Sequence, residues 1–547
     1  MLTNPTAEDS RAADGHPVRR PRRSWWAWAL PFAAVLGVLL ARNAFLFSTP
    51  LYEDADMGAN SILIEQARRF SLLVGHYSRE KFNHPGPAFL YVQSWGESLL
   101  WSVLHAVPAA WNGQLIAVYA LNALFAAAVV AVGHGWTRSV RGAVAAFAVV
   151  ALLGALHPAV FSSDWMPYVL VLAYLAFLVA IASVAAGRTA DLWVAAVAGW
   201  FCLHGHACFL LFVPFLTGCA ALALAWPRRR RLGAALRSFA ATRRRDWAAA
   251  LVISGLFLVP IVAELAAHWP GNFAKYLGYG SSGQGGGHGL GQDAGYVLWF
   301  WWPHRHAWAV ALVLAAAAIA AAWWCPRGPA RRFSGFLIGF GALSSLLIFA
   351  YAAVGVDEIH QYYIEYFAWT VPAVLVLAIA VALVAAVPRG RAVAAAATTA
   401  ALAAVVAAGA VFAAAPQSRT SVSHTDPANL ATGADTDPAL PAGVARLAAL
   451  AGGRPVVLTV PQNAWPEMTG VLVQSERSGV TACLSRPHWE FMVTSQFICS
   501  PAELAAGRRF TLYPVPGPVP RGVSIVFRFR RAVATGTLSV HAAGRRR

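Results

Sequence analysis

Long apolar runs recur between residues 25 and 415, and many reach the ~20 residues that a helix needs to cross a bilayer core of about 30 Å. Apolar residues follow one another without alternation, which predicts helices rather than the strands of a barrel. We therefore expect eleven membrane-spanning helices, at 25–48, 114–133, 142–160, 166–187, 192–204, 208–226, 247–267, 305–325, 334–354, 368–387 and 392–415.

Arginines are sorted between alternate connections of these predicted spans. If the N-terminal tail (1–24) is cytoplasmic, the inside segments hold many arginines and the short outside connections hold almost none, as membrane proteins generally show. An odd number of spans then places the C-terminus outside the cytoplasmic membrane. The inside arginines are Arg19, Arg20, Arg22, Arg23, Arg138, Arg141, Arg188, those between Arg228 and Arg245, Arg327, Arg331, Arg332, Arg389 and Arg391.

Composition agrees with a multi-pass membrane protein, because 58% of the residues are hydrophobic and only 12% are charged. A net charge of +18 suggests nucleic acid as a partner. We reject that partner because the positive charge is sorted by loop, as a topology signal that also favours contact with anionic membrane lipids.

A different kind of sequence begins near Pro416, mixed in polarity and rich in proline. The segments "RPVVLTV", "VLVQSE" and "RGVSIVFRFR" have strand character and are bounded by glycine and proline. We therefore predict an extracytoplasmic α+β domain over residues 416–547. Its two cysteines, Cys483 and Cys499, are expected to form a disulfide in an oxidising compartment, the alternative being two free thiols.

Two surface helices are predicted in the first outside loop, 49–110. The segment "ANSILIEQARRFSLLVGHY" has an amphipathic pattern suited to lying on the membrane, and "AFLYVQSWGESLLWSVL" is expected to be a second surface helix. If the second helix spanned the membrane instead, all later spans would reverse, against the arginine distribution. The apolar stripe of the first helix consists of Leu63, Ala67, Phe70 and Val74, and Ser61, Glu65 and Arg68 face away.

A second long outside stretch, 268–304, contains "GYGSSGQGGGHGLGQ". Gly278, Gly280 and Gly283 match the spacing G-x-G-x-x-G, but that motif binds dinucleotides only between a strand and a helix. We expect a mobile loop that closes over a site, or alternatively a plain flexible linker.

Three carboxylates, Glu53, Asp54 and Asp56, lie within four residues directly after the first span, in a chain with only 24 acidic residues. They could act together at the edge of the bilayer. Two simpler interpretations remain open, since the cluster could be a solvated loop end and Asp56 could cap the following helix.

The acidic loop, the two surface helices, the "HPGPAFLY" segment, the many spans and the C-terminal domain together resemble the GT-C membrane glycosyltransferases. The likeness covers residues 25–415 and is strongest to the protein mannosyltransferase and aminoarabinose transferase branch. It implies an inverting transfer of a sugar from a polyprenyl-phosphate donor to a glycan, lipid or protein acceptor at the outer face of a bacterial membrane. A divalent cation, Mg²⁺ or Mn²⁺, is the one cofactor that it leaves open.

This resemblance assigns roles to particular residues. Asp54, then Asp56, is the expected base that takes the proton of the acceptor hydroxyl, with Glu53 in the same cluster. The departing lipid phosphate needs positive charge, although each outside cation could equally contact lipid headgroups. The expected substrate-binding residues are Arg79, Lys81, His84, Lys275, Tyr362 and Tyr363.

Other polar residues gather on the same predicted side. They are His157 and Asp164 in "HPAVFSSDW", Asp357, Glu358 and His360 in "DEIHQYYIEYF", and His204 and His206 in "HGHA". An H-x-H pair without a third ligand is weak support for a metal, so we predict no metal site there.

Two other functions fit the same composition. A transporter or flippase for a lipid-linked glycan would show internal repeats and polar groups at mid-membrane, and we find neither. A non-catalytic envelope-assembly protein with a degenerate site also remains an alternative.

Overall fold

The computed structural model describes residues 25–226, 243–281, 286–386 and 436–536. Helices occur at ten of the eleven predicted spans, and the eleventh, 392–415, lies outside the described residues. Six of the described helices are long and apolar enough to cross a membrane. The ten helices are α1 (Trp26–Arg42), α4 (Ala110–Thr137), α5 (Val140–Leu156), α7 (Met166–Ala185), α8 (Leu192–Gly205), α9 (Phe209–Ala225), α11 (Arg244–His268), α14 (Ala307–Trp324), α15 (Pro329–Gly355) and α16 (Thr370–Ala386).

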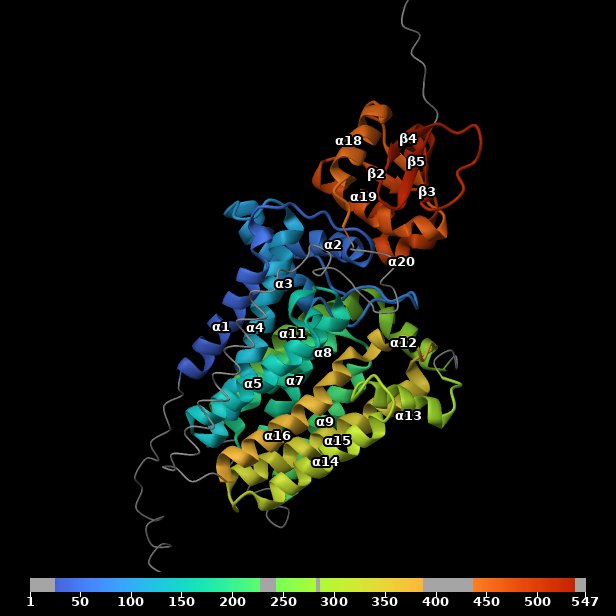
Figure 1. Cartoon of the computed structure of the whole chain (residues 1–547). Helices are drawn as coiled ribbons and strands as arrows, with labels where there is room; N and C mark the ends of the chain where they lie inside the picture. Colours follow the sequence, from blue (N-terminus) through green and yellow to red (C-terminus); the bar gives the residue numbers. More distant parts are fainter. Residues whose placement is uncertain (1–24, 227–242, 282–285, 387–435, 537–547) are drawn as a thin grey trace, which may run out of the picture.

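Helix α7 lies at the centre of this bundle, where α4, α8, α9, α15 and α16 pack around it (Figure 1). Its apolar window is wholly buried, whereas only 6% of that of α14 is buried. The exposed side chains of α14, such as Leu312 and Ile319, are apolar. An apolar outer surface suits lipid as its solvent, so the fold is that of a polytopic membrane protein.

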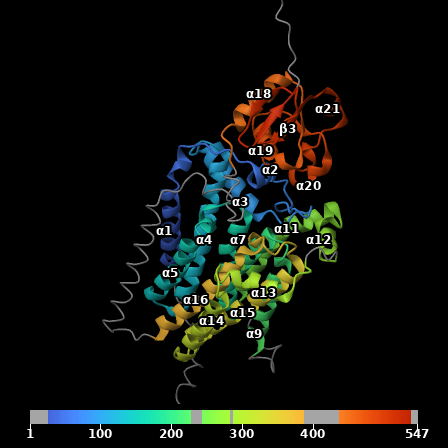
Figure 2. The ribbon, with the colours of Figure 1, turned by 45° about the vertical axis from the view of Figure 1, so that its right-hand side comes forward.

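The glycine-rich stretch 268–304 is largely helical rather than a long loop. Its described residues form α12 (Gly271–Ser281) and α13 (Leu290–Trp299), and Gly278 and Gly280 lie within α12. No strand precedes α12 among the described residues around it, so the G-x-G-x-x-G spacing lacks the strand that a dinucleotide-binding motif requires. Both helices lie at the end of the bundle that carries the C-terminal domain (Figures 1 and 2).

The C-terminal domain contains a five-stranded mixed sheet with the order β2-β1-β3-β5-β4. Strand β1 pairs in parallel with β2 and β3, whereas β5 pairs antiparallel with β3 and β4. This is the predicted α+β class, and "RPVVLTV" and "RGVSIVFRFR" do contain strands. The strands are β1 (Val456–Thr459), β2 (Ala482–Leu484), β3 (Arg508–Pro514), β4 (Ile525–Arg528) and β5 (Ala532–Thr535).

One predicted strand is wrong, because "VLVQSE" lies inside a helix, α19 (Trp465–Arg477). Its apolar residues Val471 to Val473 are buried around the helix, so a continuous apolar run here belongs to a core helix. Cys483 and Cys499 are joined by a disulfide with an Sγ–Sγ distance of 2.10 Å. The other helices of the domain are α18 (Leu440–Ala451), α20 (Glu490–Val493) and α21 (Pro501–Ala506).

Helices occur at both predicted surface segments, as α2 (Ala55–Arg68) and α3 (Ala88–Gly96), which continues into a π-helical turn, η3 (Glu97–Val103). Because α2 ends at Arg68, Phe70 and Val74 of its predicted apolar stripe lie outside the helix. The prediction that α2 lies on the membrane surface is wrong. Helix α2 lies between the C-terminal domain and α3 (Figures 1 and 2), and eleven of its 14 residues are buried. One face, with Ala59 and Ile62, belongs to the hydrophobic core of the C-terminal domain.

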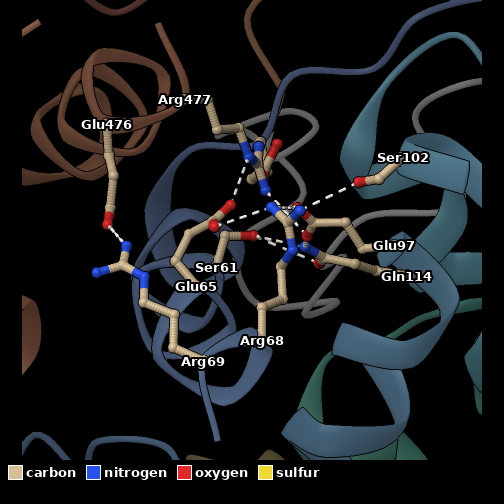
Figure 3. Close-up of polar contacts among 10 residues, drawn as sticks. Ser61, Glu65, Arg68, Arg69, Glu97, Ser102, Gln114, Glu476 and Arg477 are labelled. Carbon is tan, nitrogen blue, oxygen red and sulfur yellow. Dashed lines mark hydrogen bonds and ion pairs between the residues drawn. The ribbon is translucent and has the colours of Figure 1, made fainter. Parts of the chain in front are cut away.

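The polar face of α2 is buried in an ionic network that joins the two domains (Figure 3). Arg477, at the end of α19, lies 2.7 Å from Glu53, 3.1 Å from Glu65 and 3.4 Å from Glu97. Arg68 contacts two of these three carboxylates as well, and lies 3.0 Å from Glu65 and 2.9 Å from Glu97. The network therefore ties α19, α2 and η3 together.

Burial sets the charge of this network. Burial raises the pKa of Glu97 to about 7; Arg477 opposes this rise without cancelling it, and repulsion from the neighbouring Glu65 adds a smaller increase. At Glu65 burial acts in the same direction, but Arg477 and Arg68 outweigh it and lower the pKa. Three carboxylates thus share two guanidinium groups, and Glu97 retains its proton more readily than Glu65.

Close backbone contact between α2 and α19 depends on Gly58. A Cβ atom there would lie 2.5 Å from Oγ1 of Thr469, so Gly58→Ala is expected to force the helices apart at a cost of about 1–3 kcal/mol. The thermal midpoint of the purified protein should fall. Gly37→Ala, on an open face of α1, is the matched control and should leave it unchanged. An unchanged midpoint for Gly58→Ala would contradict this docking.

Candidate functional site

A cavity of about 810 Å³ lies between the membrane helices and the C-terminal domain. Its walls come from the first loop, the start of α7, the α8–α9 connection, α12, the end of α15 and the C-terminal domain. Six stretches that the sequence places on the outer side therefore meet at one site, although they are far apart along the chain.

Asp56 is the member of the acidic cluster that lines the cavity. Its carboxylate accepts hydrogen bonds from Nε1 of Trp165, at 3.0 Å, and from the hydroxyl of Tyr77. Two donors from different segments fix its orientation and still leave lone pairs for a ligand, since an ionised carboxylate has about four acceptor sites.

Glu53 and Asp54 are wholly buried and do not line the cavity. Glu53 pairs with Arg477, as described above, and Asp54 lies 2.6 Å from Nη2 of Arg531. Burial raises the pKa of Asp54 to about 7, although Arg531 opposes the rise. Its position therefore does not favour Asp54 as the first candidate for the base, because Asp56 is the acidic residue that reaches the cavity.

Backbone strain occurs at two residues on the cavity wall. Ala55, directly before Asp56, has φ of 49°, and Lys81 has φ of 60°. A left-handed conformation costs a side-chain-bearing residue about 1–2 kcal/mol and is concentrated at functional sites. Lys81 lies in a tight turn, in which the amide of Ser78 donates to the carbonyl of Phe82 at 2.7 Å.

Of four further residues predicted to bind substrate, two line the cavity and two do not. Arg79 lines the cavity and donates to Asp357 and Gln361. Lys275 is exposed on α12 and does not line the cavity. Tyr363 lines the cavity, whereas Tyr362 packs against Trp299 with ring centroids 4.1 Å apart, away from it.

His84 also lines the cavity, in a stack of three histidines. Its ring centroid lies 4.1 Å from that of His76 and 4.6 Å from that of His206. Nδ1 of His84 accepts a hydrogen bond from the amide of Ala207 at 3.1 Å. Burial lowers the pKa of His84 well below its ordinary value and that of His206 to about 4.

The "HPGP" and "HGHA" segments pack directly on one another. The amide of Gly86 donates to the carbonyl of His204 at 3.2 Å, and a Cβ at Gly86 would lie 2.3 Å from Nδ1 of His204. Nδ1 of His204 accepts from the amide of Ala88 at 3.2 Å. His204 is therefore a packing residue that does not line the cavity.

Metal ligands do not cluster in the part of the chain that the structure describes, where no group of three or more His, Cys, Asp or Glu side chains is placed to hold an ion. We therefore assign no residue to Mg²⁺ or Mn²⁺.

Four residues at or beside the cavity escaped the sequence analysis, namely Tyr77, Trp165, Arg477 and Arg531. Trp165 lies within the segment "HPAVFSSDW", in which the sequence pattern singles out Asp164. Asp164 is buried and accepts a hydrogen bond from Nε1 of Trp111 at 2.7 Å. Nothing in the sequence pattern marks the two arginines of the C-terminal domain, because Glu53, a partner of Arg477, and Asp54, a partner of Arg531, each lie more than 400 residues away.

Fold and cavity together define a multi-pass membrane protein with a GT-C-like fold. Two solved structures share it, both crystal structures of ArnT from Cupriavidus metallidurans, an aminoarabinose transferase. The ArnT bound to undecaprenyl phosphate has a TM-score of 0.53 and 14% identity, with 93% of this chain and 98% of ArnT covered. The apo ArnT has a TM-score of 0.53 and 15% identity, with 94% and 98% covered.

No protein-family model and no curated protein matches the sequence. At 14–15% identity the likeness to ArnT establishes the fold alone. The resemblance read from the layout of the loops and spans, which covers residues 25–415, is thereby confirmed at the level of fold, and the likeness to ArnT extends over 93–94% of the chain.

The histidine stack generates a prediction for pH dependence. A histidine whose pKa is lowered on folding gives stability that is complete above its unfolded pKa of ~6.5 and is lost as pH falls towards the folded value, by about 1.4 kcal/mol per pH unit. His206→Asn keeps a hydrogen-bond acceptor but cannot take up this proton. Its thermal midpoint should therefore fall less than that of the wild type between about pH 6.5 and about pH 4.5.

Exposed His360, changed to Asn, is the matched control and should behave as the wild type. Equal acid sensitivity of the His206→Asn variant and the wild type would show that the stack does not hold His206 neutral.

Proposed function

We propose that this protein is an inverting glycosyltransferase that transfers a sugar from a polyprenyl-phosphate donor to a hydroxyl acceptor at the membrane surface. The observation that carries the proposal is the arrangement of one cavity, in which the fixed carboxylate of Asp56 and the cations Arg79 and Lys81 are all part of the wall. ArnT with the same fold was solved with undecaprenyl phosphate bound, which supports a polyprenyl-linked donor.

Asp56 serves as the general base in this proposal. The acceptor oxygen attacks the anomeric carbon of the donor sugar, the new C–O bond forms as the bond to the phosphate oxygen breaks, and the hydroxyl proton passes to the Asp56 carboxylate. A positioned base typically contributes ~10²–10⁴-fold. Trp165 and Tyr77 aim the carboxylate, since each donates to a different oxygen of it.

Lys81 and Arg79 serve the leaving group. The electron pair of the broken bond stays on the polyprenyl phosphate, and a cation that is already in place stabilises that charge without reorganisation. The strained turn at Lys81 supports this role, because a glycine there would avoid the strain but would carry no charge. Arg79 is held by Asp357, so its guanidinium is oriented before a substrate arrives.

The acceptor is proposed to lie against the C-terminal domain. That wall carries Trp465, Trp489 and Phe491, and Phe491 packs near Tyr77 with ring centroids 6.0 Å apart. Its one cation, Arg531, is paired with Asp54. Amphipathic aromatic rings with little net charge suit an uncharged glycan better than an anionic lipid headgroup.

The proposed orientation follows from the arginine sorting. The cavity and the C-terminal domain face the outside of a bacterial cytoplasmic membrane, and the N-terminus is cytoplasmic. Lipid-linked donors are used on that face, and an uncharged glycan of the cell wall or surface is the acceptor class that the aromatic wall supports.

Asp56→Asn tests the proposal, because it keeps the shape of the side chain and removes the base. In a transfer assay with a panel of synthetic polyprenyl-phosphate sugars, we expect kcat to fall by about 10²–10⁴-fold with little change in donor binding. Glu490→Gln makes the same chemical change on the exposed surface of the C-terminal domain and should retain full activity. Transfer at the wild-type rate by Asp56→Asn would exclude Asp56 as the base. If the wild-type protein transferred no donor sugar at all, the proposal that it is a glycosyltransferase would be contradicted.

The two lysines of the chain form a matched pair for the phosphate. Lys81→Ala should lower kcat/KM for the donor by about tenfold or more, because a hydrogen bond to a charged group contributes about 1.5–3 kcal/mol. Lys275→Ala, outside the cavity, should have no effect. A larger loss of kcat/KM for Lys275→Ala than for Lys81→Ala would contradict the placement of the phosphate beside the turn at residues 78–82.

A further inference from the structure

The turn that carries Asp56 is held by the C-terminal domain along its whole length. The amide of Asp437 donates to the carbonyl of Tyr52 at 2.9 Å, and Glu53 is bridged to Thr436. Asp54 pairs with Arg531 at 2.6 Å, and Oγ1 of Thr469 lies 2.9 Å from the carbonyl oxygen of Ala55.

We propose that Thr469 and Arg531 are positioning residues, through which the C-terminal domain holds the turn Asp54–Ala55–Asp56 in the strained form that aims Asp56 into the cavity. This inference rests on the proposed function of Asp56. It gives the C-terminal domain a part in the reaction that is distinct from contact with substrate.

Ala55 is the point at which the turn needs support. Its φ of 49° lies in the left-handed region, which alanine rarely occupies, so this turn would relax if it were free. Thr469 is wholly buried and its hydroxyl is shared between the carbonyls of Ala55 and Pro466, each at 2.9 Å. The strained carbonyl therefore has a fixed donor on α19.

Asp54 supports the same conclusion. It occupies the N-cap position of α2, where an aspartate usually accepts a hydrogen bond from the first turn of its own helix. Here its side chain makes no such bond and reaches Arg531 instead. Arg531 is in turn 3.4 Å from Glu467 and lines the cavity, so it ties the turn to the base of the C-terminal domain.

Two glycines allow the turn and α2 to pack closely against α19. A Cβ at Gly58 would lie 2.5 Å from Oγ1 of Thr469, and one at Gly470 would lie 2.9 Å from the carbonyl oxygen of Glu53. The turn and α19 therefore pack closely against one another, with no room for a side chain at either glycine.

Thr469→Val tests the inference, because valine has the same shape and cannot donate. We expect kcat for sugar transfer to fall by about ten- to a hundredfold while KM for the donor stays unchanged, since misplacing a catalytic group by about 1 Å has an effect of that order. Thr469→Ser restores the hydroxyl and should restore kcat. Adding Ala55→Gly to Thr469→Val should recover part of the loss, because glycine adopts the left-handed form without strain.

Hydrogen exchange provides a readout that does not depend on turnover. In Thr469→Val the amides of residues 55–60 should exchange faster than in the wild type, whereas those of α7 should not change. Unchanged exchange at residues 55–60 would overturn the inference. A wild-type kcat in Thr469→Val beside an inactive Asp56→Asn variant would also overturn it and would leave the proposed function standing, whereas failure of the wild type to transfer any donor would remove the proposed function itself.

Discussion

The buried guanidinium of Arg477 is the interaction that the arrangement of the two domains depends on. Only 8% of its side chain is exposed, and it meets the carboxylates of Glu53, Glu65 and Glu97. Leaving one partner of such a buried pair alone costs about 3–5 kcal/mol, so both domains are held to the geometry that satisfies all of the charges. The first loop is consequently folded against the C-terminal domain rather than spread on the membrane.

This constraint reaches the cavity through α2. The helix contributes Ala59 and Ile62 to the core of the C-terminal domain, and its first turn contributes Asp56 to the cavity wall. Acidic residues that follow one another in sequence thereby separate by role. Glu53 and Asp54 hold the domain, and Asp56, two residues further on, is the carboxylate that faces the cavity.

The spans and the class of the C-terminal domain could be predicted because long apolar runs and the change near Pro416 are local signals. The site could be predicted only in part. Asp56, Arg79, Lys81, His84 and Tyr363 line the cavity, but nothing in the pattern separates Asp56 from Asp54, because that difference is made by Arg531, far along the chain. The amphipathic pattern of α2 led to a wrong prediction of a membrane-surface helix for the same reason, because its polar face contacts Arg477, a buried arginine far along the chain.

The central claim is that the phosphate of a polyprenyl-linked donor binds in the cavity beside Asp56. Its most direct test is a structure of this protein determined with polyprenyl phosphate bound. The account predicts phosphate oxygens within about 3 Å of the Lys81 ammonium group, in the same cavity as the Asp56 carboxylate. A phosphate bound elsewhere, with this cavity closed to it, would contradict the account.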